Sequence, residues 1–441
     1  LLAALLPLPG LGEAGHICFV LFVAAAAFWI TETIPPFATG LAVIISSIYI
    51  LGMPGGPLGL ESTGLQTSYQ IFLNPIASPV LVLFFGGLIL AVAASKHGLD
   101  VRLARAFIRP FGTHPRMVLL GIISITALFS MFMSNTATTA MMIAIVAPLF
   151  KYFEDRPGFK QALVLAVPFA ANIGGMGTII GTPPNAVAAS VLLQLGYPVS
   201  FLRWMLFGVP LVIVLLAALW LILLAAFKIK KDRFELLFPE PLAVTWDLVV
   251  VVVTFVVTVL LWLTEPLNHL PAAVVALIPV GVFTVTGIID RDDLQKLEWH
   301  VLILVAGGLT LGVAMKVSGL SEYLSGHLAQ VPLPATLMIV VVALATVLLS
   351  NFMSNTAAAN LLIPIAGALG TVSPLIGAIT VALAASLAMS LPISTPPNAI
   401  AFATRAVTTR ELATYGTLVS IIGVALLLLV VYLFRAIGVF G

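Results

Sequence analysis

The chain has 441 residues, of which 61% are hydrophobic and only 8% are charged, whereas a soluble domain carries about 25% charged residues. This composition excludes a soluble globular enzyme and predicts an all-α polytopic membrane protein. The single cysteine, Cys18, excludes an intrachain disulfide framework and a multi-cysteine metal site. The formal net charge of +2 points to no particular partner, and no nucleic-acid partner is expected.

The apolar sequence divides into segments long enough to cross a membrane, which takes about 20 mostly apolar residues. Residues 1–11 are apolar but too short to span, which leaves open whether an N-terminal helix precedes them. Two of the predicted spans, 160–196 and 374–404, are long and contain Pro-Pro, so we expect two broken spanning helices. In chain order, the predicted spans are 13–31, 35–52, 76–95, 160–196, 201–228, 243–264, 270–289, 299–316, 374–404 and 412–437.

Two further apolar stretches, 115–150 and 332–367, each carry the tripeptide Ser-Asn-Thr near the middle, as Ser134-Asn135-Thr136 and Ser354-Asn355-Thr356. Each stretch is too long for one helix and too short for two full spans. They are predicted to form two re-entrant helical hairpins, each of which enters and leaves the membrane on the same side. A polar motif in apolar sequence is unfavourable in a membrane unless it lines a cavity. We therefore expect the tripeptides to lie at the hairpin tips, in a binding site.

The basic residues predict the orientation of these segments, because cytoplasmic loops of membrane proteins carry an excess of Lys and Arg. If 96–116 faces the cytoplasm, the predicted spans put four further loops on the same side. Together the five loops hold 16 of the 19 Lys and Arg residues. The basic, amphipathic stretch 96–110 is expected to lie along the cytoplasmic surface as a linker. The four further loops are 151–160, 228–241, 290–298 and 405–411.

The two halves of the chain carry matched motifs in the same order, which indicates an internal repeat. Five predicted crossings separate equivalent points, so the repeats are expected to be inverted, with the hairpin tips meeting near the membrane midplane. Inverted repeats with interrupted helices are typical of secondary transporters. Besides Ser-Asn-Thr, the matched pairs are Gly181-Thr182-Pro183-Pro184-Asn185 with Ser394-Thr395-Pro396-Pro397-Asn398, Trp29-Ile30-Thr31-Glu32 with Trp262-Leu263-Thr264-Glu265, residues 80–88 with 301–309, and His97-Gly98-Leu99 with Ser318-Gly319-Leu320.

The residue types at the tips and breaks predict what the site binds. Unwound backbone exposes carbonyl oxygens, which suit hard cations, and the helix N-termini that follow each break suit anions. Ser and Asn oxygens can also ligate a cation, while the Asn amide and the Thr hydroxyl can donate to an anion. No acidic residue lies mid-span in this map, no Lys or Arg lies in the predicted site, and the six histidines lie at or near span ends. Sodium coupling is therefore favoured over proton coupling.

Two other classes of protein are weaker interpretations of the same features. An intramembrane hydrolase would need a base within hydrogen-bond reach of a serine nucleophile, and the map offers no mid-span candidate. A channel stays open as an alternative, although the duplicated hairpins favour alternating access.

The paired Ser-Asn-Thr motifs, the paired Thr-Pro-Pro-Asn loops, the two hairpins and the inverted repeat resemble the divalent anion/sodium symporters. These are the INDY-type di- and tricarboxylate transporters related to human solute carrier family 13. The resemblance covers nearly the whole chain. It implies a homodimeric, elevator-type transporter in which a scaffold domain holds the dimer and a transport domain carrying both hairpins slides across the membrane.

The resemblance also implies domain boundaries. Scaffold helices are expected in 1–110, which includes the amphipathic linker, and in 243–330. The transport domain is expected to comprise the first hairpin and broken helix in 111–200 and the second hairpin, second broken helix and last span in 331–441. The remaining residues, 201–242, hold the last span of the first repeat and a cytoplasmic linker.

By motif match, the resemblance implies which residues bind. The anion-binding residues would be Asn135, Thr136, Asn355 and Thr356, with Pro183 and Pro396 close by. The first sodium ion would be bound by Ser130, Ser134, Asn135 and the backbone near Gly181. The second would be bound by Ser350, the carbonyl of Met353, Asn355 and the backbone near Ser394. The serines at 350 and 394 are mild departures from the family pattern, which backbone ligation tolerates.

These expectations combine into a sodium-coupled importer of C4-dicarboxylates such as succinate, malate or fumarate, and not an enzyme. Sodium binding would organise the hairpin tips and offset the charge of the anion before the loaded domain moves. Two alternatives remain on the same scaffold, namely sodium-independent dicarboxylate exchange and transport of sulfate or a tricarboxylate. Short loops without soluble domains suggest a bacterial inner membrane. The expected partners are the anion, sodium, membrane lipid and a second copy of the chain.

Overall fold

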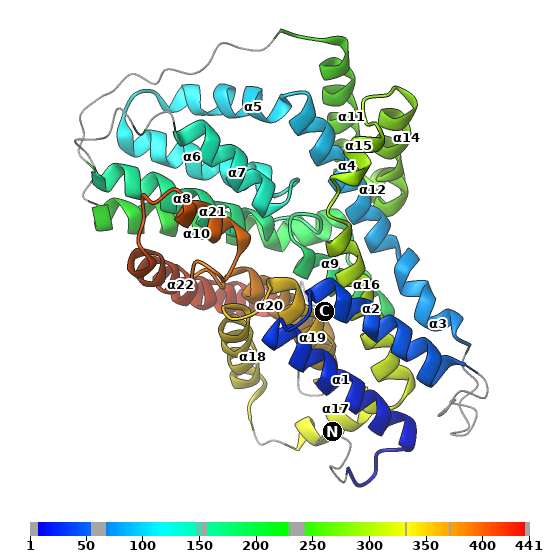
Figure 1. The fold of residues 1–441 in the computed structure, drawn as a ribbon. Helices are drawn as coiled ribbons and strands as arrows, with labels where there is room; N and C mark the ends of the chain where they lie inside the picture. Colours follow the sequence, from blue (N-terminus) through cyan, green and yellow to red (C-terminus); the bar gives the residue numbers. More distant parts are fainter. Residues whose placement is uncertain are drawn as a thin grey trace.

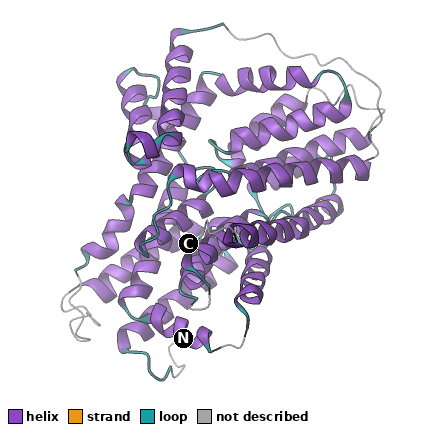
Figure 2. Ribbon diagram, turned by 180° about the vertical axis from the view of Figure 1, so that it is seen from behind, coloured by secondary structure: helices purple, strands orange, loops and turns teal. Residues whose placement is uncertain are grey.

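The computed structural model describes residues 8–53, 68–147, 150, 157–227, 229, 243–330, 333–369 and 372–436. Every regular element in these residues is a helix and none is a strand, as the colouring of Figure 2 shows. The prediction of an all-α protein is therefore confirmed for the described part of the chain.

Six helices among the described residues are long and apolar enough to cross a membrane. They have 18 to 28 residues, and at 1.5 Å per residue this length suits a hydrocarbon core about 30 Å thick. All six coincide with predicted spans. They are α1 (Glu13–Thr31), the segment Gln70–Lys96 that joins α3 (Gln70–Leu73) to α4 (Pro79–Lys96), α10 (Phe201–Phe227), α11 (Trp246–Leu263), α16 (Trp299–Val317) and α22 (Thr409–Ala436).

Two predicted spans are shorter in the structure than expected, 35–52 and 270–289. In the first, α2 (Pro36–Ser46) passes into a π-helix at Ser47–Gly52. In the second, α13 (Ala272–Val275) and α14 (Leu277–Val285) are separated by one residue. The first difference is a change of hydrogen-bond register, and the second is an interruption at Ala276. The apolar composition that identifies a span encodes neither.

Both predicted broken helices are interrupted, and their prolines act differently from the prediction. The first consists of α8 (Pro157–Gly175) and α9 (Pro183–Gln194), and the second of α20 (Pro374–Ser386) and α21 (Pro396–Ala403). The predicted breaks are present, but the prolines do not end the preceding helix, because each pair lies in the first turn of the following helix. Proline is favourable there, since the missing N–H has no helical partner. We call the unwound segments the first break loop (176–182) and the second break loop (387–395).

In each half of the chain, the second helix of the broken pair packs against the other half. The first hairpin consists of α6 (Pro115–Ser130) and α7 (Asn135–Val146), and the second of α18 (Ala335–Ser350) and α19 (Asn355–Gly367). The helix α9 of the first half packs against α19 and α20 of the second half, whereas α21 packs against α7 and α8 of the first. Each break loop is therefore followed by a helix that is embedded in the other half.

The helices α8 and α20 lie in the protein interior. Side chains of residues 162–167 in α8 and 381–385 in α20 are at most 2% exposed, and the first break loop is buried throughout. Irregular backbone at membrane depth is tolerated only where protein or a cavity surrounds it. The burial of these helices therefore allows the chain to unwind beside them.

Figure 1 shows two groups of helices side by side, with α9 and α19 between them. One group contains α6, α7, α8, α10, α18, α20, α21 and α22, and the other contains α1, α2, α4, α11, α14 and α16. In the second group, α2 and α16 approach closely at two glycines. A Cβ atom added at Gly307 would lie 2.3 Å from the Cα of Gly40, so position 307 requires glycine for this contact.

The matched sequence motifs adopt the same local geometry in both halves. The indole of Trp29 donates to the carbonyl of Pro36 at 3.1 Å, and the indole of Trp262 donates to the carbonyl of Ala272 at 2.9 Å. Each Trp is buried and ties the end of one helix to the start of the next. In the same way, left-handed glycines precede both α5 (Leu99–Ile108) and α17 (Leu320–Ala329).

An ion cluster joins the end of α4 to α15 (Arg291–Gln295). Lys96 donates to Asp290 at 3.0 Å and also to Asp293, and Lys296 donates to Asp293 at 3.2 Å. Burial raises the pKa of the Asp293 carboxyl, but hydrogen bonds from Lys96, from the backbone N–H of Asp290 and from Lys296 outweigh it and hold the pKa at about 2. The cluster therefore ties together two of the predicted cytoplasmic loops.

The predicted orientation also depends on basic residues that lie outside the described residues, so it stays a prediction. These residues are Lys151, Arg156, Lys228, Lys230, Lys231 and Arg233.

The short α12 (Glu265–Asn268) completes the set of described α-helices.

Candidate functional site

A cavity of about 710 Å³ brings the predicted site residues together. Both Ser-Asn-Thr tripeptides and both break loops contribute to its wall, although they come from different halves of the chain. Its size lies in the range of small-molecule sites, about 300–1,000 Å³. The wall contains all the residues predicted to contact the anion, namely Asn135, Thr136, Pro183, Asn355, Thr356 and Pro396.

The residues predicted to bind cations are divided between the cavity wall and the layer behind it. The wall contains Ser134, Asn135, Gly181, Asn355 and Ser394. Behind it, Ser130 and Ser350 are fully buried at the ends of α6 and α18, and Met353 is buried in the turn of the second hairpin. Their roles as cation ligands remain predictions.

The serine of each tripeptide starts the second helix of its hairpin. The Ser134 hydroxyl accepts the backbone N–H of Ala137 at 3.3 Å, and the Ser354 hydroxyl accepts that of Ala357 at 3.2 Å. This is the N-cap arrangement, which satisfies a backbone donor that the helix itself leaves free. As a result the N-terminal, partly positive ends of α7 and α19 lie at the cavity.

The two asparagines of the tripeptides are held in the same way. The Ser130 hydroxyl donates to Oδ1 of Asn135 at 2.6 Å, and the Ser350 hydroxyl donates to Oδ1 of Asn355 at 2.8 Å. A hydroxyl that donates keeps its own lone pairs, and an amide oxygen that accepts one hydrogen bond keeps a second site. Each pair therefore places two neutral oxygens side by side, an arrangement that can ligate a hard cation.

The asparagines of the Thr-Pro-Pro-Asn motifs close the break loops. The Asn185 amide donates to the carbonyls of Gly175 and Thr178 at 3.0 and 2.8 Å. The Asn398 amide donates to the carbonyls of Met389 and Leu391, both at 2.9 Å. Each asparagine thus fastens the helix after the break to the loop before it. The sequence showed the repetition of these asparagines but not this bracing role.

A further asparagine, Asn172, joins the two halves at the cavity and was not identified from the sequence. It is fully buried, accepts from the Asn135 amide at 3.3 Å, and donates to the Thr395 hydroxyl at 3.3 Å. The equivalent position in the second half, aligned on Thr-Pro-Pro-Asn, is Ala385. An amide in an otherwise apolar span was the signal that could have identified it.

Carboxylates also line the cavity, which was not predicted from the sequence. Glu32 follows α1 and Glu298 precedes α16, and His300 also contributes to the wall. The Ser134 hydroxyl donates to Oε1 of Glu298 at 2.8 Å. Both carboxylates come from helix ends, in agreement with the absence of mid-span acids, and no Lys or Arg contributes to the described wall.

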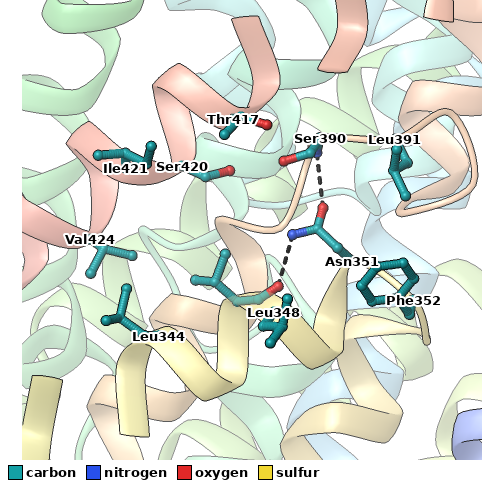
Figure 3. A pocket seen from close by; sticks show the side chains of 11 residues that line it. Leu344, Leu348, Asn351, Phe352, Ser390, Leu391, Thr417, Ser420, Ile421 and Val424 are labelled. Carbon is teal, nitrogen blue, oxygen red and sulfur yellow. Dashed lines mark hydrogen bonds between the residues drawn. The ribbon is translucent and has the colours of Figure 1, made fainter. Parts of the chain in front are cut away.

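A second pocket, of about 330 Å³, lies between α18, α22 and the second break loop. Figure 3 shows apolar side chains of α18 and α22 facing across it, with Asn351 at its edge beside Ser390. The Asn351 side-chain oxygen accepts from the backbone N–H of Ser390 at 3.0 Å and from the Ser394 hydroxyl at 2.9 Å. Asn351 therefore ties the second hairpin turn to the second break loop, whereas the first hairpin has Met131 at the equivalent position.

The sequence profile of the citrate transporter family (CitMHS) matches residues 26–382. The sodium-dependent dicarboxylate transporter SdcS of Staphylococcus saprophyticus is 33% identical over 462 residues, which cover 96% of this chain and 86% of that protein. SdcS of Staphylococcus aureus strain USA300 is 33% identical over 451 residues, which cover 92% of this chain and 83% of that protein. The similarity therefore extends over nearly the whole chain and is not confined to the motifs.

Two solved structures share the fold. The YdaH transporter of Alcanivorax borkumensis superposes with a TM-score of 0.62 at 15% identity, over 97% of this chain and 99% of that one. MtrF of Neisseria gonorrhoeae, described with a class of antimetabolite efflux pumps, superposes with a TM-score of 0.57 at 11% identity, over 93% of this chain and 97% of that one. At these identities the likeness concerns the fold alone.

Proposed function

We propose, from the premise that this chain belongs to the citrate transporter family and is a divalent anion/sodium symporter, that it imports C4-dicarboxylates such as succinate, malate or fumarate together with sodium ions. The chain is an integral membrane protein and a transporter, not an enzyme. One observation carries the proposal, namely the cavity that both Ser-Asn-Thr tripeptides and both break loops line.

The anion is proposed to bind between the two hairpin tips. The side chains of Asn135 and Thr136 would donate from one tip and those of Asn355 and Thr356 from the other, with Pro183 and Pro396 close by. The N-terminal ends of α7 and α19 favour negative charge at the same places. A dicarboxylate has one carboxylate for each tip, which suits a cavity built from two similar halves.

The coupling sodium ions are proposed to bind beside the anion. The first would be held by Ser130, Ser134, Asn135 and the backbone near Gly181, and the second by Ser350, the Met353 carbonyl, Asn355 and the backbone near Ser394. The Ser–Asn oxygen pair in each half supports this assignment, because neutral oxygens suit a hard cation. Two monovalent cations would balance the two charges of the substrate.

The proposal extends to an elevator mechanism in a homodimer. The two hairpins would open from opposite sides of the membrane, and the helices that carry them would move as one transport domain along the scaffold. The matched local geometry of the two halves supports the inverted repeat. The apolar faces of α11 and α14 are exposed, for example at Trp246 and Val285, and would face lipid or a second copy of the chain.

Uptake of labelled succinate into proteoliposomes tests the proposed function. We expect uptake when an inward sodium gradient is present and none when potassium replaces sodium, because no Lys or Arg in the described wall of the cavity would hold the anion alone. Sodium-independent uptake that requires dicarboxylate inside the vesicles would instead identify an exchanger. Competition by sulfate or citrate but not by succinate would assign a different anion to the same cavity.

The Asn351 side chain provides a test of the second cation site. We expect Asn351→Ala to raise the sodium concentration for half-maximal uptake between about fivefold and about 30-fold, since it removes two hydrogen bonds, each worth roughly 1 kcal/mol, that hold the second break loop. Thr417→Ala is the control, because it alters the wall of the same pocket without removing these bonds. An unchanged sodium dependence in Asn351→Ala would contradict a site that includes the backbone near Ser394.

A further inference from the structure

We propose that Glu298 is an internal competitor of the transported anion. In the conformation described here, the Glu298 carboxylate accepts the hydrogen bond of the Ser134 hydroxyl at the tip of the first hairpin. A carboxylate in this position favours release of the substrate. This inference rests on the proposed function, because it concerns the same cavity and an anionic substrate.

The first step of the argument is the contact itself. The Ser134 hydroxyl donates to Oε1 of Glu298 at 2.8 Å, and the same hydroxyl accepts the N–H of Ala137 as the N-cap of α7. The helix α7 has 12 residues, and its N-terminal end favours a negative charge. A carboxylate of the protein therefore already uses the kind of subsite that an anionic substrate requires.

The second step is the shared space. Glu298 lines the same cavity as Asn135 and Thr136, which directly follow Ser134. A substrate carboxylate bound to these residues would lie near the Glu298 carboxylate, and two like charges at one helix end repel each other. No Lys or Arg in the described wall would offset this repulsion. Binding the anion at the first tip therefore requires Glu298 to move away or to tolerate a like charge.

The third step is the difference between the two tips. Ser354 caps α19 as Ser134 caps α7, yet its hydroxyl has no carboxylate partner in the part of the chain that is described. Glu298 belongs to the segment that leads into α16, whereas Ser134 belongs to the hairpin, so their hydrogen bond links the two groups of helices in Figure 1. If the hairpin moves relative to α16, this bond must break. Glu298 then competes with the anion only in the conformation in which this bond is made.

A competing interpretation predicts the opposite effect. Ser134 is a predicted ligand of the first sodium ion, and while its hydrogen is donated to Glu298 its oxygen still has a lone pair for a cation. Glu298 could then strengthen sodium binding. In that case its removal would weaken sodium binding and would not tighten succinate binding, so measurements at saturating sodium separate the two roles.

The test compares succinate uptake by wild type, Glu298→Gln and Glu298→Ala in proteoliposomes at saturating sodium. In both variants we expect the succinate concentration for half-maximal uptake to fall about tenfold, which corresponds to about 1.4 kcal/mol, and the maximal rate to fall because release is slower. Glu298→Asp keeps the charge and should stay within about threefold of wild type, which corresponds to less than about 1 kcal/mol. This variant separates the effect of charge from that of packing.

Two matched controls complete the design. Glu32→Gln removes the other carboxylate of the described wall, and its effect should be smaller than that of Glu298→Gln, because the bond to the Ser134 hydroxyl is made by Glu298. Glu322→Gln removes an exposed carboxylate outside the cavity and should leave both constants unchanged. Equal constants in wild type and Glu298→Gln, or weaker succinate binding in the variant, would refute the inference while the proposed function stands. Failure of wild type to take up succinate in any mode would refute the proposed function, and this inference with it.

Discussion

Replacing Asn135 or Asn355 by alanine is expected to abolish dicarboxylate transport while the protein still folds. Each asparagine lines the cavity and is held by a buried serine hydroxyl, at 2.6 Å in the first half and 2.8 Å in the second. Alanine removes a donor for the anion and an oxygen ligand for the cation in one step. We expect a loss of at least about 100-fold in the rate of succinate uptake, which corresponds to about 2.7 kcal/mol.

Uptake by proteoliposomes reports the loss of transport, and size-exclusion chromatography with thermal unfolding of the purified variants reports whether they fold. Asn74→Ala is a suitable control, because Asn74 is exposed and lies far along the chain from both tripeptides. If both cavity variants transport at near-normal rates, the assignment of the site to the Ser-Asn-Thr tips is wrong.

Replacing Gly307 by alanine is expected to destabilise the fold severely. The new Cβ would lie 2.3 Å from the Cα of Gly40 and 2.7 Å from its carbonyl oxygen. These are backbone atoms that cannot rotate away, so α2 and α16 would have to separate. Overpacking of this kind costs about 1–3 kcal/mol and more where the backbone must move, and we expect the upper end of that range or beyond.

The same helix provides a matched control for this prediction. A Cβ added at Gly312 would have its nearest neighbours at 3.9 Å, and alanine favours a helix over glycine by about 1 kcal/mol. Gly312→Ala should therefore unfold at the wild-type temperature or above it, while Gly307→Ala unfolds well below it or fails to accumulate. Equal melting temperatures for the two variants would show that the α2–α16 contact is looser than described.

The long spans could be predicted from the sequence, because apolar composition and length determine them directly. The predicted span at 299–316 corresponds to α16 (Trp299–Val317), and that at 201–228 to α10 (Phe201–Phe227). The π-helix at Ser47–Gly52 could not be predicted, because it differs from an α-helix in hydrogen-bond register and not in composition. The prolines of Thr-Pro-Pro-Asn were misinterpreted for a related reason, since a proline can end one helix or begin the next.

The convergence of the two tripeptides could be predicted because a polar motif in apolar sequence needs a cavity, and two copies in matched positions favour a shared one. Glu298 could not be identified in this way. It lies in a charged loop with Asp290 and Asp293, where local sequence indicates an ordinary solvated segment, and its partner Ser134 is 164 residues away. Asn172 was recognisable as an unusual polar residue, but its partners come from other helices. Such contacts depend on tertiary packing and leave no periodic signal.

The exchanged broken helices determine when the binding cavity can form during synthesis. The helix α9 packs against α19 and α20, which the ribosome produces much later. The helices that surround the first break loop are therefore complete only when most of the chain has been synthesised. Contacts between distant segments are also slow to form. The second break loop is made last and depends on α7 and α8 through α21. Neither half of the protein, produced alone, would contain a complete cavity.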